Sequence, residues 1–144
     1  MPQPLPTLDP ALRNIKIIHL AMMAPIFVYA IIAERVVQPN ATPPDMMLVW
    51  ILAAMSVAMA LGSLAVRSAL VTRNADILRT DAANTSAIGR WIMGSIVAFA
   101  LAESIALYGL VLRILGVQRE YAFGFYAVSF VTLLLLTPRD PRQT

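Results

Sequence analysis

Four runs of apolar residues, separated by short polar segments, divide the chain. They cover residues 15–33, 46–66, 91–115 and 121–137. A helix needs about 20 residues to cross the hydrocarbon core of a bilayer, and irregular backbone cannot face lipid. The pattern therefore predicts an all-α integral membrane protein with a single membrane domain. Its four transmembrane helices are expected to form an up-down-up-down bundle.

Proline and capping residues mark the predicted helix ends. Residues 1–9 are a proline-rich tail, and Asp9, which is followed by proline, is the expected N-cap of the first helix. Residues 42–45, Thr-Pro-Pro-Asp, match a capping box ahead of the second helix. Pro138 is expected to stop the last helix, which leaves residues 138–144 as a polar tail.

The polar segment 67–90, between the second and third runs, carries helical spacing of its own. Its apolar stripe continues out of the second run through Val66, Leu70, Ile77 and Leu78. Thr80 or Asp81 is expected to cap a new helix. Two helices of roughly 33 residues, each about 50 Å long, would exceed the ~30 Å hydrocarbon core. We therefore expect a helical hairpin that projects from one membrane face; the alternative is a flexible loop.

Lysine and arginine are distributed unequally between the two predicted membrane faces. One face carries Arg13, Lys16, Arg67, Arg73, Arg79, Arg90, Arg139 and Arg142. The other carries Arg35, Arg113 and Arg119. Because positive charge accumulates in cytoplasmic loops, this predicts a multi-pass protein of the cell inner (plasma) membrane, with both termini and the hairpin cytoplasmic. A cleaved signal peptide is the competing interpretation of the first run, and the long charged segment before that run argues against it.

Composition narrows the chemistry. Apolar residues make up 59% of the chain and charged residues 13%, against about 45–50% and 25% in soluble domains. There is no cysteine and a single histidine, His19, which excludes disulfides, thiolate nucleophiles, His-cluster metal sites and a Ser-His-Asp triad within the chain. The net charge of +3 comes from arginines that flank apolar runs, so nucleic acid is not an expected partner. We expect no catalytic, cofactor or metal site.

One ionisable residue, Glu103, lies deep inside an apolar run. Counted from Trp91 to Leu115, it falls at the expected bilayer midplane. A charge at that depth is costly, so an intramembrane carboxylate is a functional hypothesis by default. Ser56 and Ser129 are expected near the same depth and would form a polar cluster with it. Such a cluster either joins helices through hydrogen bonds or handles protons or cations.

The sequence around Glu103 resembles a known membrane family. Residues 102–110, Ala-Glu-Ser-Ile-Ala-Leu-Tyr-Gly-Leu, are similar to the carboxylate helix of the rotor-ring proteolipids of F- and V-type ATPases. The resemblance implies that Glu103 binds H⁺ or Na⁺, with Ser104 and Tyr108 as auxiliary groups. The glycine-rich inner helix of those proteins has no counterpart in the first two runs.

Taken whole, the chain resembles small, uncharacterised four-helix membrane proteins encoded in bacteria. The features that carry this resemblance are Arg90-Trp91, the Glu103 helix ending in Leu112-Arg113-Ile114-Leu115-Gly116, and Pro138-Arg139. The resemblance implies no activity.

Small residues recur four apart on two of the predicted helices. They are Ala54, Ala58 and Gly62 on the second, and Gly94, Ala98, Ala102 and Ala106 on the third. Small residues let helix backbones approach, so the two stripes are expected to pack these helices together, with dimerisation as the alternative.

The resulting functional hypothesis is a non-enzymatic membrane accessory or scaffold subunit, because no nucleophile–base pair or acid–base pair can be assembled. Its partners would be the lipid bilayer and either another membrane protein or a second copy. The alternative function is proton or cation translocation through Glu103.

Overall fold

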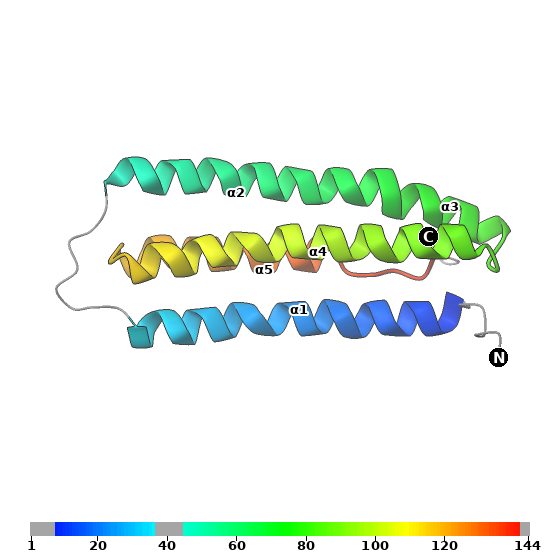
Figure 1. Cartoon of the computed structure of the whole chain (residues 1–144), viewed down its shortest axis with the longest axis horizontal. Helices are drawn as coiled ribbons and strands as arrows, with labels where there is room; N and C mark the ends of the chain where they lie inside the picture. The colour runs from blue at the N-terminus through cyan, green and yellow to red at the C-terminus, as the bar shows by residue number, and fades with distance from the viewer. Residues whose placement is uncertain (1–7, 37–44, 142–144) are drawn as a thin grey trace.

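The structure is a computed structural model that describes residues 8–36 and 45–141. Every regular element within these residues is helical, which confirms the all-α prediction. The elements are α1 (Leu8–Val36), α2 (Met46–Val66), the π-helical turn η1 (Arg67–Thr72), α3 (Arg73–Thr80), α4 (Thr85–Ile114) and α5 (Arg119–Leu135). Consecutive long helices run in alternate directions (Figure 1).

Within the described part of the chain, three helices are long and apolar enough to cross a membrane: α1, α4 and the continuous helix Met46–Thr80 that joins α2, η1 and α3. The fourth, α5, has 17 residues and is about 26 Å long at 1.5 Å per residue, slightly less than the ~30 Å core. Composition and helix length thus support a membrane protein with at least three candidate spans.

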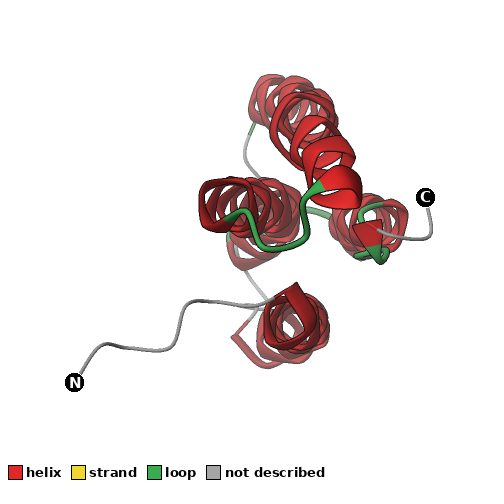
Figure 2. Cartoon of the chain, turned by 90° about the vertical axis from the view of Figure 1, so that its right-hand side faces the viewer, coloured by secondary structure: helices red, strands yellow, loops and turns green. Residues whose placement is uncertain are grey.

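The helix α4 is the centre of the fold. It packs against α1, α2, η1, α3 and α5, whereas α1 and α2 lie on opposite sides of it and do not touch (Figures 1 and 2). Its buried side chains are accordingly distributed around the whole helix and include Trp91, Phe99, Ile105 and Leu112. A residue on α4 can therefore face any of three neighbouring helices, depending on its rotation about the axis.

Helix ends differ from the predicted ones by a few residues. The first helix starts at Leu8, so Asp9 lies in its first turn and is not the N-cap. The cap of α2 is Asp45, whose carboxylate accepts from the Met47 N–H; residues 42–44 lie outside the described part of the chain. The cap of α4 is Asn84, which accepts from the Ala87 N–H at 3.0 Å, and neither Thr80 nor Asp81 has this role.

The C-terminus of α4 ends in a Schellman motif. Gly116 has φ of 85°, a conformation in which a Cβ is costly. The N–H groups of Gly116 and Val117 bond to the carbonyls of Arg113 and Leu112 at 3.1 and 3.0 Å. Leu112 and Val117 are both buried and share one apolar cluster, so the turn into α5 is fixed by backbone bonds and by packing.

The two helices predicted to pack through small residues, α2 and α4, do pack together, but of the α2 stripe only Gly62 faces α4. Ala54 and Ala58 are exposed, and the buried positions of α2 are Val49, Ser56 and Ser63, seven residues apart. On α4, a Cβ added at Gly94 would lie 2.6 Å from the Leu70 Cβ of η1, which marks a close approach of those two helices. The sequence stripe identified small residues but not the helix that each one faces.

Residues 67–80 are helical, and the first turns of α4 pack against them. Leu78, Ile88 and Trp91 are buried in one cluster with residues from the start of α1. Those α1 residues are Leu8, Ala11, Leu12 and Ile15. The C-terminal segment also contributes, because the Arg79 Nε–H donates to the Pro141 carbonyl at 3.2 Å. At this end of the molecule three helices are therefore packed together, and their buried side chains continue the main apolar core of the bundle.

Candidate functional site

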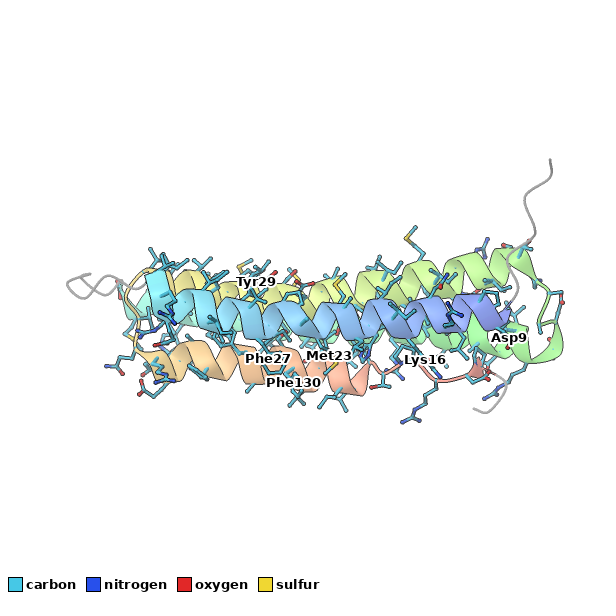
Figure 3. All side chains as sticks on the ribbon, turned by 90° about the horizontal axis from the view of Figure 1, so that it is seen from below. Asp9, Lys16, Met23, Phe27, Tyr29 and Phe130 are labelled. Atoms are coloured by element: carbon cyan, nitrogen blue, oxygen red, sulfur yellow. The ribbon has the colours of Figure 1, made fainter. Side chains whose placement is uncertain are left out.

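The carboxylate of Glu103 bonds to a residue that the sequence did not single out. The Tyr29 hydroxyl of α1 donates to Glu103 Oε1 of α4 at 2.8 Å, and both side chains are half-buried. Figure 3 shows Tyr29 on the side of α1 that faces α4, whereas Phe27 points toward Phe130 of α5. The bond joins two helices 74 positions apart in sequence, so no local pattern could have identified it.

The serines predicted around Glu103 bond elsewhere. The Ser129 hydroxyl donates to the Ala102 carbonyl at 2.7 Å. Its partner is therefore a backbone oxygen of the residue before Glu103, and not the Glu103 carboxylate. The Ser56 hydroxyl donates to Leu52 O of its own helix at 2.8 Å. Hydroxyls inside helices commonly bond to the carbonyl four residues back, and that rule could have anticipated the bond of Ser56.

The two auxiliary residues suggested by the rotor-ring resemblance also bond or pack away from Glu103. The Ser104 hydroxyl donates to the Ala100 carbonyl of its own helix at 2.8 Å. Tyr108 is half-buried and packs against the cluster formed with α2. The four predicted residues Glu103, Ser56, Ser129 and Tyr108 therefore face different neighbours instead of forming one cluster.

His19 forms a second polar link between helices. Its Nε2 lies 2.8 Å from the Leu133 carbonyl of α5, so this nitrogen carries the proton and donates. The ring is buried and stacks at a tilt on Phe99 of α4, with ring centroids 4.9 Å apart. A single histidine thus contacts both neighbours of α1, which is a role that fixes helix positions.

A cluster of one glutamate and two arginines joins α1 and α4 at the end of the bundle where α4 is followed by α5. Arg113 donates from Nε to Glu34 Oε1 at 3.0 Å and from its Nη2 to Glu34 Oε2 at 3.3 Å, a two-point contact between α4 and α1. Its Nη1 donates to the Val117 carbonyl at 3.1 Å. Arg119 approaches the same carboxylate at 3.8 Å and lies over the Phe123 ring. Two of the three arginines predicted on this face therefore share one counter-ion.

Tyr126 carries the one buried side-chain polar atom without a hydrogen-bond partner among the described residues, its hydroxyl oxygen. The ring packs beside Gly109 of α4, where an added Cβ would lie 3.0 Å from Tyr126 Cε1. This orphaned hydroxyl lies in the seam between α4 and α5, in the same part of the bundle as the Glu34–Arg113 pair.

The described residues do not form a metal-binding site. Within residues 8–36 and 45–141, no three His, Asp or Glu side chains lie close enough to hold one. Four surface cavities have volumes of about 260 to 430 Å³, and Glu103 lines none of these four.

Comparison with known proteins found no match among protein-family models, curated proteins or solved structures.

Proposed function

We propose that the chain is a four-span inner-membrane accessory protein without enzymatic activity, which uses a cytoplasmic helical extension to hold another protein. The first support is the outward face of α5. Its exposed large side chains are Tyr121, Phe123, Val128, Val131, Leu134 and Leu135. A continuous apolar face of this size is stable only when lipid or protein covers it, and 17 residues is within the range for a membrane span.

The surface changes character beyond the end of α5. The extension, defined here as residues 67–90, exposes mainly polar side chains after its first turn. They include Arg73, Asp76, Arg79, Thr80, Asp81, Thr85, Ser86 and Arg90. The start of α1 beside it likewise exposes Arg13 and Lys16. Polar outward faces on all three helices favour a position in water, and the excess of positive charge favours the cytoplasmic side.

The observation that carries the scaffold assignment is how the internal polar groups are used. Tyr29 and Glu103, Ser129 and the Ala102 carbonyl, and His19 and the Leu133 carbonyl each join two different helices. A group that binds and releases an ion must exchange its partners, whereas these groups fix the relative positions of α1, α4 and α5. They support a rigid frame that presents the extension.

Single-cysteine labelling tests the topology cleanly, because the chain contains no cysteine. With a membrane-impermeant maleimide, we expect Thr80→Cys to react only in inverted vesicles and Gln118→Cys only from the periplasmic side. Val131→Cys, on the outward face of α5, should react from neither side because lipid covers it. Labelling of Val131→Cys in water, or of Thr80→Cys from the periplasm, contradicts the proposal.

The same strategy tests for a partner. Arg73→Cys carrying a photoreactive maleimide should form a discrete adduct with a second protein, identified by mass spectrometry, and Gln118→Cys should not. Arg73→Cys is chosen because Arg73 is exposed and makes no ion pair among the described residues. Adducts with lipid alone would contradict the scaffold function, and adducts with a second copy would replace the partner by a homo-oligomer.

Proton or cation translocation is the second candidate, and the half-buried Tyr29–Glu103 pair is the observation that favours it. Glu103→Gln keeps an oxygen acceptor for the Tyr29 hydroxyl, so the scaffold function expects little change in stability. Glu103→Leu and Tyr29→Phe should each cost about 0.6 to 1.7 kcal/mol, with the double variant costing less than their sum.

Flux measurements decide between the two functions. We expect the wild-type protein in vesicles to pass no more H⁺ or Na⁺ than empty vesicles under an imposed gradient. Flux that Glu103→Gln abolishes, without loss of folded protein, would establish translocation in place of the scaffold function.

A further inference from the structure

A basic cavity lies where α5 ends, between the Met46–Thr80 helix and the start of α4. It has a volume of about 300 Å³, which is large enough for a phosphate-bearing headgroup but not for a whole phospholipid. The segment after α5, through Pro138 and Arg139, forms one side. Trp91, Ala98 and Phe99 of α4 form an apolar wall.

Three arginines line this cavity, and two of them form no ion pair with the residues that the structure describes. Arg79 is paired with Asp76 at 3.2 Å. Arg67 donates to the Leu135 carbonyl, the last residue of α5, and forms no ion pair with a carboxylate among residues 8–36 and 45–141. Arg139 forms none there either, and its charge lies close enough to repel that of Arg67. Among the described residues, the lining thus has three arginines and one carboxylate, Asp76, which is paired with Arg79.

Arg67 and Arg139 lie at the level where the outward faces of the helices change from apolar to polar. Arg67 lies directly after the apolar run of α2, and its contact with Leu135 places it at the level where α5 stops. The outward faces are mainly apolar on one side of this level and mainly polar on the other. Basic pockets between helices at the cytoplasmic interface are a recurrent place for the headgroups of anionic lipids.

We propose that this cavity binds the phosphate group of an anionic phospholipid, with Arg67 and Arg139 as its ligands; the inference rests on the proposed membrane position. Guanidinium groups donate through paired N–H groups that fit phosphate oxygens, and a phosphate between them removes the repulsion of the two cations. The glycerol end of the lipid would lie against the wall made by Trp91 and Phe99. Arg79 is already paired with Asp76 and contributes less.

The test is lipid binding to the purified full chain in a neutral detergent, measured by native mass spectrometry. Phosphatidylglycerol should remain bound at about tenfold lower concentration than phosphatidylcholine, because the choline cation of phosphatidylcholine offsets the charge of its phosphate and is repelled by the arginines of the cavity. Arg139→Gln should reduce retention of phosphatidylglycerol about tenfold, and Arg67→Gln at least as much. Arg73→Gln, an exposed arginine outside the cavity, should change it less than twofold.

Three outcomes would overturn the proposal. Equal binding of the two lipids, or unchanged retention in Arg139→Gln, removes the site. If inorganic phosphate alone raises the melting temperature as much as phosphatidylglycerol does, the ligand is free phosphate and not a lipid. Arg139→Gln decides the matter if Arg67→Gln fails to fold, because Arg139 is exposed and makes no hydrogen bond among the described residues. Binding in detergent does not depend on orientation, so cysteine labelling can fail while this result stands.

Discussion

Gly109→Ala is expected to lower the free energy of unfolding by about 1–3 kcal/mol, although it adds only one methyl group. The added Cβ would lie 2.9 Å from the Ala122 carbonyl oxygen and 2.9 Å from Phe125 Cβ on α5. Neither atom is the free end of a flexible side chain, so α5 as a whole must move away from α4. That movement would loosen the Ser129–Ala102 bond and the packing of Tyr126.

Two other glycines supply matched controls. A Cβ at Gly124 of α5 or at Gly89 of α4 meets nothing within 4 Å. There the change to alanine should be neutral or stabilise by up to about 1 kcal/mol, because alanine has the higher helix propensity. Unfolding followed by circular dichroism during titration with a denaturing detergent measures all three variants. Equal stability of Gly109→Ala and Gly124→Ala would show that α4 and α5 do not approach as closely as described.

The helices could be predicted well from the sequence, because the patterns that indicate a helix and its ends are local. Long apolar runs, Asp45 at a helix start and Pro138 after a helix end are each visible within a few residues. The helical content of residues 67–80 was likewise predicted from apolar spacing. Of that stripe, however, only Leu78 is fully buried, while Leu70 and Ile77 are more than a third exposed. The period predicted a helix correctly but not which side of it faces the core.

The candidate site was less predictable, because its bonds depend on the rotation of each helix about its axis. In lipid the outward face is as apolar as the inward one, so hydropathy does not mark the packed side. Glu103 could be identified from its position in the middle of an apolar run. Its partner Tyr29 could be identified only from the three-dimensional arrangement of α1 and α4. The arginine cavity could not be predicted either, because Arg67 and Arg139 are distant in sequence. From the sequence, both arginines indicate only the orientation of the chain in the membrane.

Reversing one charge at the opposite end of the bundle should have the other large effect. Arg113→Glu removes the two-point contact with Glu34 and leaves the Val117 carbonyl without its guanidinium donor. It also places two carboxylates together at a site where the Arg113 side chain is only 16% exposed. A partly buried pair lies between an exposed pair and a fully buried one, so we expect a loss of about 2–3 kcal/mol.

The control acts on the same carboxylate. Arg119 approaches Glu34 at 3.8 Å but is 60% exposed, so Arg119→Gln should change stability by less than about 0.5 kcal/mol. The exchange Glu34→Arg with Arg113→Glu should recover part of the loss, because opposite charges again face each other, but not all of it, because the contact with Val117 is still missing. Detergent-titration unfolding at low and high salt measures the series. If Arg113→Glu and Arg119→Gln cost the same, the Glu34–Arg113 pair is an ordinary surface contact, and the packing of α1 on α4 depends on Tyr29, His19 and the apolar core instead.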